Sequence, residues 1–202
     1  MLYFYSACIY GDPHIVTLDG HKYTFNGKGE FTLIETEDAT FTMQGRMEPA
    51  TTADGTDAPG TVFTAIVAIQ HQTNTNVQFE IKSTGVKVKL GDEFIDFDEM
   101  KEITFSEVTL EDKGNATVTA AFSEGTSIEL KVENGIISVM LVSLPSYQKG
   151  KTRGLMGNFN GDPNDDLVPK DATTPIPPDS SIETIHYTFG MTCKVPALRD
   201  MP

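Results

Sequence analysis

About a dozen short segments of this chain alternate apolar and polar residues, and no long stretch carries the 3.6-residue repeat of an amphipathic helix. The clearest alternation lies at residues 77–81, 86–90 and 128–132. A period of two places successive side chains on opposite faces of a strand, so each segment can bury one face. The pair Asn134-Gly135 is the strongest hairpin turn signal. Strands at this spacing predict an all-β, two-sheet sandwich-like fold.

The expected elements can be assigned along the chain. Strands are predicted at residues 15–17, 23–25, 30–35, 40–47, 62–70, 77–81, 86–90, 94–97, 103–110, 116–122, 128–132 and 136–142. Residues 48–61 contain Pro49, Gly55 and Pro59 and are expected to form an exposed loop. Ser180 and Glu183 fit a capping box, which predicts a short C-terminal helix over residues 182–188. We expect one domain over residues 8–195, with flanks at 1–7 and 196–202.

One irregular loop, residues 154–166, is rich in side chains that carry oxygen. Gly157 and Gly161 allow its backbone to turn tightly. Alternating oxygen ligands in a loop with glycines suit a hard cation such as Ca²⁺, although the same residue types form ordinary polar turns. The candidate ligands in this loop are Asn158, Asn160, Asp162, Asn164, Asp165 and Asp166.

The formal net charge of the chain is -14. The phosphate backbone of nucleic acid would be repelled by this charge, whereas cations and an extracellular setting suit it. Acidic residues are concentrated between residues 92 and 112. They are expected to form a solvated face, with a calcium-mineral surface as the alternative. These acidic residues are Asp92, Glu93, Asp96, Asp98, Glu99, Glu102, Glu107, Glu111 and Asp112.

The sequence Asp12-Pro13-His14 contains an acid-labile peptide bond. The Asp carboxyl group can attack its own carbonyl carbon, the proline nitrogen leaves readily, and the imidazole can deliver a proton. Self-cleavage between Asp12 and Pro13 is therefore one hypothesis, and an ordinary turn before a strand is the other.

Several functional classes lack support. The four histidines have no metal-ligand spacing, and there is neither a phosphate-binding loop nor a nucleophile elbow. No run of about 20 apolar residues could span a membrane. The two cysteines, Cys8 and Cys193, could form one bridge between the ends of the chain, remain free thiols, or pair with another chain. The single sequon, Asn115-Ala116-Thr117, is compatible with a secreted glycoprotein.

Taken together, these motifs resemble the von Willebrand factor type D (VWD) domain. Several signatures occur in the order that the family shows. They are Gly11-Asp12-Pro13-His14, Thr17-Leu18-Asp19-Gly20, Tyr23-Thr24-Phe25-Asn26-Gly27, the segment from Gly154 to Asp162, and Phe189-Gly190-Met191-Thr192.

The resemblance implies a β-sandwich-like fold in an extracellular protein. It implies Ca²⁺ bound by the loop residues, with Asp19 as a further ligand, and self-cleavage at Asp-Pro in some members. The chain departs from most members at Arg153 and Met156, where they carry cysteines, and at Gly29. It is similar to the cysteine-poor domain of membrane mucins that also carry NIDO and AMOP domains, so disulfide-linked polymerisation is not expected.

The leading hypothesis is therefore a non-enzymatic, calcium-stabilised extracellular adhesion or matrix module. It would be secreted or part of a membrane protein's ectodomain, with any anchor outside this segment. Its expected partners are extracellular proteins, matrix or mineral surfaces. The alternative is an acidic matrix protein that binds calcium mineral.

Overall fold

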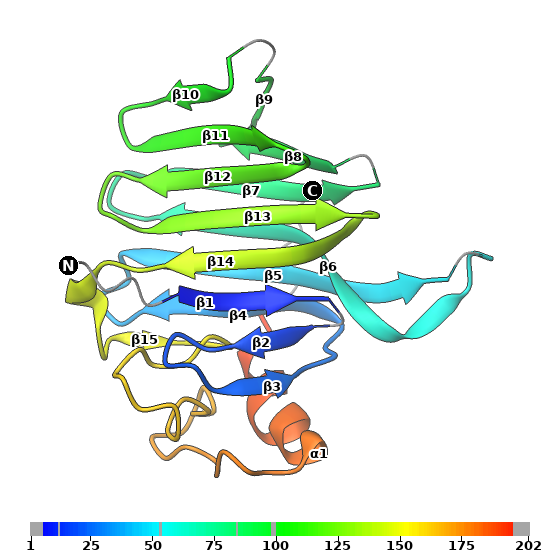
Figure 1. Ribbon diagram of the computed structural model, residues 1–202. Helices are drawn as coiled ribbons and strands as arrows, with labels where there is room; N and C mark the ends of the chain where they lie inside the picture. The colour runs from blue at the N-terminus through cyan, green and yellow to red at the C-terminus, as the bar shows by residue number, and fades with distance from the viewer. Residues whose placement is uncertain (1–5, 12, 53, 84, 98–99, 196–202) are drawn as a thin grey trace.

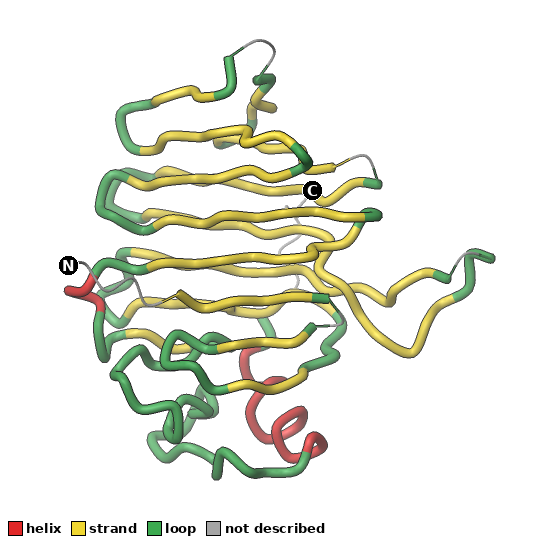
Figure 2. The backbone as a smooth tube through the Cα atoms, viewed as in Figure 1, coloured by secondary structure: helices red, strands yellow, loops and turns green. Residues whose placement is uncertain are grey.

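Two antiparallel sheets pack face to face in the computed structural model, which describes residues 6–11, 13–52, 54–83, 85–97 and 100–195 (Figure 1). Strands dominate the backbone, and helical turns are confined to two short segments (Figure 2). The predicted all-β two-sheet architecture is confirmed.

The first sheet has the order β10-β11-β12-β13-β14-β1-β2-β3. Its strands are β10 (Glu102–Thr104), β11 (Val108–Gly114), β12 (Thr117–Phe122), β13 (Ser127–Glu133), β14 (Ile136–Ser143), β1 (Ser6–Tyr10), β2 (His14–Val16) and β3 (Lys22–Thr24). The second sheet has the order β15-β4-β5-β6-β7-β8-β9. Its strands are β15 (Thr152–Arg153), β4 (Gly29–Thr36), β5 (Phe41–Thr51), β6 (Asp57–Gln70), β7 (Thr75–Lys82), β8 (Gly85–Leu90) and β9 (Glu93–Ile95).

The chain order brings the beginning and the end of the strand region together. Strands β4 to β9 form a meander in one sheet, and β10 to β14 form a meander in the other. Strand β1 then pairs with β14 on one side and β2 on the other. Because β15 returns to the edge of the second sheet beside β4, the segment after it lies at the same end of the sandwich as the β2–β3 hairpin (Figure 1).

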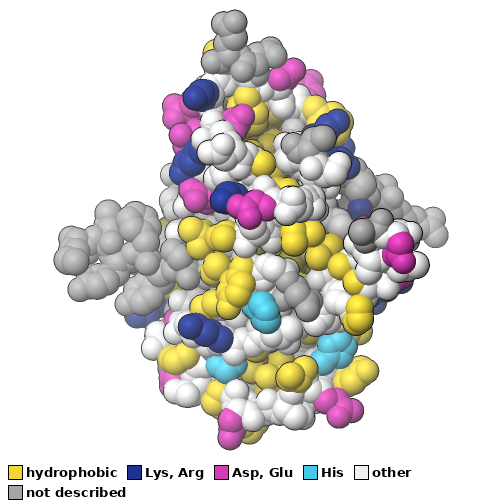
Figure 3. All heavy atoms as spheres, turned by 45° about the vertical axis from the view of Figure 1, so that its right-hand side comes forward, with side chains coloured by type: hydrophobic (Ala, Val, Ile, Leu, Met, Phe, Trp, Pro, Cys, Tyr) yellow, Lys and Arg dark blue, Asp and Glu magenta, His cyan; other side chains and the backbone are white. Residues whose placement is uncertain are grey.

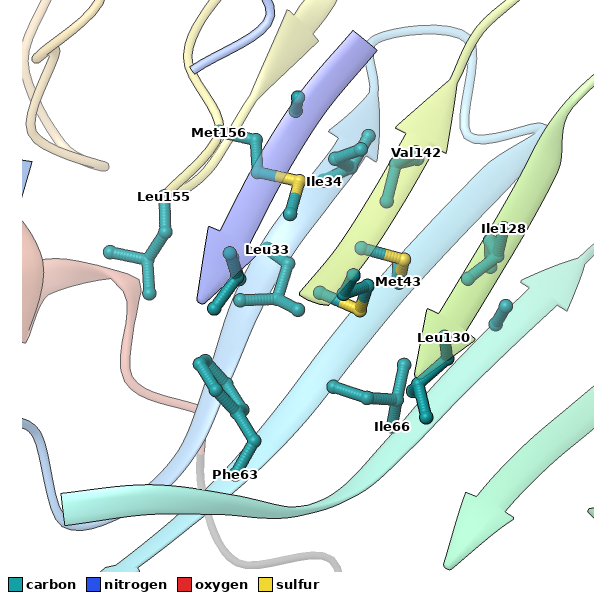
Figure 4. Packing of buried hydrophobic residues seen from close by; sticks show 14 of the residues in the cluster. Leu33, Ile34, Met43, Phe63, Ile66, Ile128, Leu130, Val142, Leu155 and Met156 are labelled. Carbon is teal, nitrogen blue, oxygen red and sulfur yellow. The ribbon is translucent and has the colours of Figure 1, made fainter. Parts of the chain in front are cut away.

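The core fills the space between the sheets. Leu33 and Met43 come from one sheet, and Leu130 and Val142 from the other, and all four are fully buried (Figure 4). In β13 the residues Ile128, Leu130 and Val132 are buried while the intervening side chains reach solvent, as the period of two predicts. Leu155 and Met156 extend this core toward the predicted cation loop (Figure 4).

A short helical segment near the C-terminus confirms the predicted helix and its start at Ile182 but corrects its capping residue. It comprises α1 (Ile182–Thr184), a π-helical turn η2 (Ile185–Phe189) and a 3-10 turn η3 (Gly190–Cys193). A further 3-10 turn, η1 (Ser146–Gln148), lies between β14 and β15. The N-cap is Ser181, whose hydroxyl oxygen accepts a hydrogen bond from the Thr184 amide at 3.1 Å. Ser180 instead donates to the Pro177 carbonyl at 2.6 Å, so the capping box predicted from Ser180 is wrong by one residue.

Two segment predictions are wrong. Residues 103–110 do not form one strand, because a turn closed by Phe105 N–H and the Val108 carbonyl separates β10 from β11. Within residues 48–61, the end of β5 (residues 48–51) and the start of β6 (residues 57–61) form a β-ribbon that projects beyond the sandwich, where a loop was expected (Figure 1). Pro49 is tolerated there because the neighbouring strand β4 pairs with β5 only as far as Met47, so the missing N–H deprives no adjacent strand of a partner.

Strand β1 was not predicted. After Ser6 its residues are all apolar or aromatic, so it lacks the alternation used to identify the other strands. It lies inside the first sheet, where Ala7 and Ile9 are buried in the core and Cys8 faces the other side. No helix within the described ranges is long and apolar enough to cross a membrane.

Candidate functional site

The loop that follows β15 is anchored to both sheets at its start. The amides of Leu155 and Met156 donate to carbonyls of β4, at 3.1 and 2.9 Å. The Met156 carbonyl accepts from Leu18 N–H at 2.9 Å, and the Leu155 carbonyl accepts from the Tyr23 hydroxyl at 2.5 Å. Both loop side chains are fully buried. The oxygen-rich part of the loop therefore begins from a fixed point beside the β2–β3 hairpin.

Asp19, in the β2–β3 turn, contacts this loop directly. One carboxylate oxygen accepts a hydrogen bond from Asn160 N–H at 2.8 Å, and the other accepts from Gly161 N–H at 2.9 Å. Gly161 has a φ of 97°, which an L-residue rarely adopts. The turn and the loop are thus joined through two charge-assisted hydrogen bonds.

Asp166 is the most buried acid of the loop, with 2% of its surface exposed. Its carboxylate accepts hydrogen bonds from the Thr17 hydroxyl at 2.5 Å and from Asn158 N–H at 3.0 Å. Burial raises the pKa of Asp166 to about 6; the two hydrogen bonds oppose this, and the charges of Asp19 and Asp165 add to it. At neutral pH the fold therefore holds a desolvated negative charge beside two others.

Gly157 leaves room for the Asp166 carboxylate. Its φ is 85°, and a Cβ atom at this position would lie 2.0 Å from Asp166 Oδ1. Both the backbone conformation and the close approach therefore require glycine. This requirement explains one of the two glycines on which the loop interpretation was based.

Two asparagine side chains surround Asp165. Asn158 Nδ2 donates to Asp165 Oδ1 at 2.8 Å, and Asn160 Nδ2 donates to both carboxylate oxygens at 3.0 and 2.9 Å. Asp162 and Asn164 lie further out, at the exposed tip, where Asn164 N–H donates to Asp162 Oδ1 at 3.0 Å. This bond and a second one from the Asn164 side chain hold the pKa of Asp162 below its ordinary value.

A cavity of about 350 Å³ lies beside the loop and reaches its inner face. Asn158 and Asp166 contribute to its wall, together with Arg153 and Lys170. The side chain of Arg153 is paired with Glu35 at 3.0 Å. A small solute can therefore approach the buried carboxylate from this side.

The residues of the loop fit a hard cation in their chemistry. Asp19 and Asp165 lie close enough to Asp166 for their charges to act on it. The asparagines add amide oxygens, and carboxylate and amide oxygens are the ligand types that Ca²⁺ prefers. Within the described ranges, no three His, Cys, Asp or Glu side chains are already gathered in a metal-binding arrangement. A cation here would therefore depend on amide and backbone oxygens as well as on carboxylates.

The Asp12-Pro13-His14 sequence is described only in part, because Asp12 lies outside the described residues. His14 is exposed in β2, and its Nδ1 lies 2.9 Å from Thr24 Oγ1. The ring of His14 also lies 5.2 Å from that of Tyr10, measured between centroids. The Pro13 carbonyl accepts from Phe25 N–H at 3.1 Å. Self-cleavage stays a prediction.

The expected bridge between Cys8 and Cys193 is absent, since both are free thiols. The alternation of β1 provides the reason: Ala7 and Ile9 face the core, so Cys8 points to the outer face of the first sheet. Cys193 is buried at the end of η3. Burial raises the pKa of both thiols, to about 12 for Cys193.

The acidic residues between 92 and 112 are spread over several strands rather than gathered at one point. Glu93 lies in β9, Glu102 in β10, and Glu111 and Asp112 in β11. On the face shown in Figure 3, acidic and basic side chains are interspersed over the upper part of the molecule. A mineral-binding surface stays a prediction, as does the modification of Asn115, which lies in an exposed turn.

Sequence reasoning missed two residues that contribute to the site. Thr17 and Tyr23 fall in predicted strands and in signatures of the resemblance, but neither is predicted to contribute to the site. Their hydroxyls nevertheless contact Asp166 and the Leu155 carbonyl. Alternation shows which side chains are buried but not what a buried hydroxyl contacts. Nothing in the local pattern distinguishes these two residues.

The fold and the loop define a class: a two-sheet β domain closed at one end by an oxygen-rich loop. The family model of the von Willebrand factor type D domain matches residues 7–173. The chain belongs to this family.

Several much longer known proteins are similar to the chain. It is 32% identical over 186 residues to human Sushi domain-containing protein 2, covering 91% of this chain and 22% of that protein. It is 32% identical over 202 residues to human Mucin-4, covering 94% of this chain and 4% of that protein. It is 29% identical to Protein mesh of Bombyx mori, covering 91% of this chain and 12% of that protein. The chain thus spans less than a quarter of the length of these relatives, and the family places it in an extracellular or ectodomain setting.

Proposed function

We propose that this chain is a calcium-stabilised, non-enzymatic module of an extracellular adhesion or matrix protein. Its family and relatives support the extracellular module, and the calcium role is the step that we add. The proposed ligands are Asp19, Asn158, Asn160, Asp162, Asn164, Asp165 and Asp166.

The observation that carries the proposal is the buried carboxylate of Asp166 beside the charges of Asp19 and Asp165. Desolvated like charges are unfavourable for the fold unless a cation or a proton neutralises them. A bound Ca²⁺ would supply two positive charges beside Asp166 and its two acidic neighbours.

The protein's own residues have separable roles in this proposal. Asp19 already connects the first hairpin to the loop through the amides of Asn160 and Gly161. Asp165 and Asp166 supply charge, and Asn158 and Asn160 supply amide oxygens. Asp162 and Asn164, at the exposed tip, are the outer members of the set. The ion would strengthen a connection between chain segments far apart in sequence, which is a structural task and not a catalytic one.

Isothermal titration of chelator-treated protein with Ca²⁺ tests the proposal. We expect one saturable site that Asp165→Asn weakens by at least about tenfold, because the substitution removes one of three carboxylates. Glu48→Gln, an exposed change in the β5–β6 ribbon, is the matched control and should bind as the parent does. Absence of Ca²⁺ binding by the folded parent would refute the calcium role.

Self-cleavage is a separate hypothesis that rests on the Asp12-Pro13-His14 sequence. Incubation near pH 5–6, where histidine gains its proton, should release the short N-terminal peptide. If Asp12→Ala is cut as fast as the parent, the hypothesis is wrong, and the calcium proposal is unaffected.

A further inference from the structure

The hairpin between β11 and β12 presents the sequon of the chain at the surface. Strand β11 ends at Gly114 and β12 begins at Thr117, and these two residues pair across the ladder. The two-residue loop is Asn115-Ala116, with φ values of 51° and 52°. Positive φ at both positions is typical of a type I′ turn, in which asparagine is favoured.

The side chain of Asn115 is accessible to a modifying enzyme. It is exposed, and it makes no hydrogen bond to any residue that the structure describes. The Thr117 hydroxyl stays beside it, 3.4 Å from the Asn115 carbonyl oxygen. The acceptor amide and the hydroxyl that define the sequon therefore lie together on a turn that projects from the sheet.

A second turn shows which part of this arrangement the fold needs. The β13–β14 hairpin has the same length, and its Asn134 has a φ of 53° and is also exposed. There the residue two positions on is Ile136, so no sequon is present. Turn geometry thus explains an asparagine at both places, but it does not require a threonine two positions later, because Ile136 stands there in the matched turn.

We propose that Asn115 carries an N-linked oligosaccharide. The amide nitrogen of Asn115 would form a bond to the anomeric carbon of an oligosaccharide supplied by a lipid-pyrophosphate donor. The bond between that carbon and the pyrophosphate oxygen breaks, the amide nitrogen loses one proton, and the lipid pyrophosphate leaves. The extracellular setting of the family takes the chain through the compartment where such donors act.

The position of the turn determines what the oligosaccharide would cover. Ala116 lies near Gly85, and Gly135 lies near Ser83, so the β7–β8, β11–β12 and β13–β14 turns meet at one rim. In Figure 1 this rim lies along the right-hand side of the sandwich, whereas the 154–166 loop lies at its lower left. The oligosaccharide would shield the rim from partners and leave the loop accessible.

Secretion of this chain from eukaryotic cells tests the inference. We expect a gel shift that an amide-cleaving glycosidase removes, converting Asn115 to aspartate in the peptide that contains it. Asn115→Asp should lack the shift while keeping a residue that tolerates positive φ. Thr117→Ser should keep the shift and Thr117→Ala should lose it.

Ile136→Thr, which completes a sequon at Asn134, supplies a positive control. If this variant gains a shift while the secreted parent shows none, the inference is overturned, because the cells glycosylate a matched turn but not Asn115. Circular dichroism of every variant confirms folding. The affinity for Ca²⁺ should be the same before and after deglycosylation. The glycosylation inference can therefore fail without affecting the calcium proposal.

Discussion

The carboxylate of Asp19 accepts hydrogen bonds from the backbone amides of Asn160 and Gly161, at 2.8 and 2.9 Å. Asp19 and Asn160 are 141 positions apart in the sequence. Together with the bond from Thr17 to Asp166 and that from Tyr23 to Leu155, this contact joins the first hairpin to the last loop. The end of the sandwich is thus closed by polar contacts between segments far apart in the chain.

Tyr23→Phe should destabilise the protein by about 1–3 kcal/mol, because it leaves the buried Leu155 carbonyl without its hydroxyl donor. Urea denaturation measures the change. Tyr187→Phe, at a side chain that is 68% exposed, should have no measurable effect. Equal stability of Tyr23→Phe and the parent would show that this bond does not hold the loop.

Gly157→Ala should cost at least about 3 kcal/mol, because the new methyl group meets the Asp166 carboxylate at a backbone conformation unfavourable to alanine. Gly55→Ala separates the two effects: its φ of 84° nearly equals the 85° of Gly157, but its surroundings are open. We expect only about 1–2 kcal/mol there. Similar costs for both variants would mean that the loop moves freely away from Gly157.

The sequence predicts the strands well where one face is buried. Residues 128–132 alternate because Ile128, Leu130 and Val132 fill the core while their neighbours reach solvent. The same rule fails for β1, whose outer face carries Cys8 and Tyr10 rather than clearly polar residues. It also fails for the β5–β6 ribbon, where proline and glycine are tolerated because no third strand pairs beside them.

The candidate site was predictable only in part. Local spacing identified residues 158–166 as candidate ligands, because the candidate ligands of this loop lie close together in the sequence. The participation of Asp19 came from family resemblance, since no periodicity connects positions so far apart. The contacts of Thr17 and Tyr23 depend on how the two sheets meet, and that is a property of the packed structure.

Glu80 makes a pH-dependent contribution to the stability of the fold, and this contribution does not involve the 154–166 loop. Its carboxylate pairs with Lys82 at 2.9 Å and Lys89 at 3.2 Å, and the hydrogen bond from Lys82 is the main cause of its lowered pKa. A carboxyl group with a lower pKa in the folded state stabilises the fold above its unfolded pKa of 4.5, and this stabilisation is lost as pH falls through the folded value.

Glu80→Gln should therefore cost about 1 kcal/mol at neutral pH, and this cost should shrink toward zero near pH 3. Urea denaturation over this pH range measures the difference between variant and parent. A cost that stays constant with pH would show that packing, and not charge, explains the effect.

The two cysteines should behave as separate thiols. The intact mass of non-reduced protein should show both as free, and Cys193 should react with a thiol reagent only after unfolding, because it is 3% exposed. Cys8, half-buried on the outer face, should react in the native state. A non-reduced mass lower by two hydrogen atoms, with the difference disappearing on reduction, would show instead that the ends of the chain are bridged.

The thermal melt of the parent, in saturating Ca²⁺ and in chelator, tests the central claim most directly when compared with that of Asp166→Asn. The parent should melt about 5–10 °C higher with Ca²⁺, as expected for ligand at about 100 times its Kd. In chelator, Asp166→Asn should melt no lower than the parent, because the neutral amide removes the buried charge. Its increase in melting temperature on addition of Ca²⁺ should be largely lost. Identical melts of the parent with Ca²⁺ and with chelator would contradict the account.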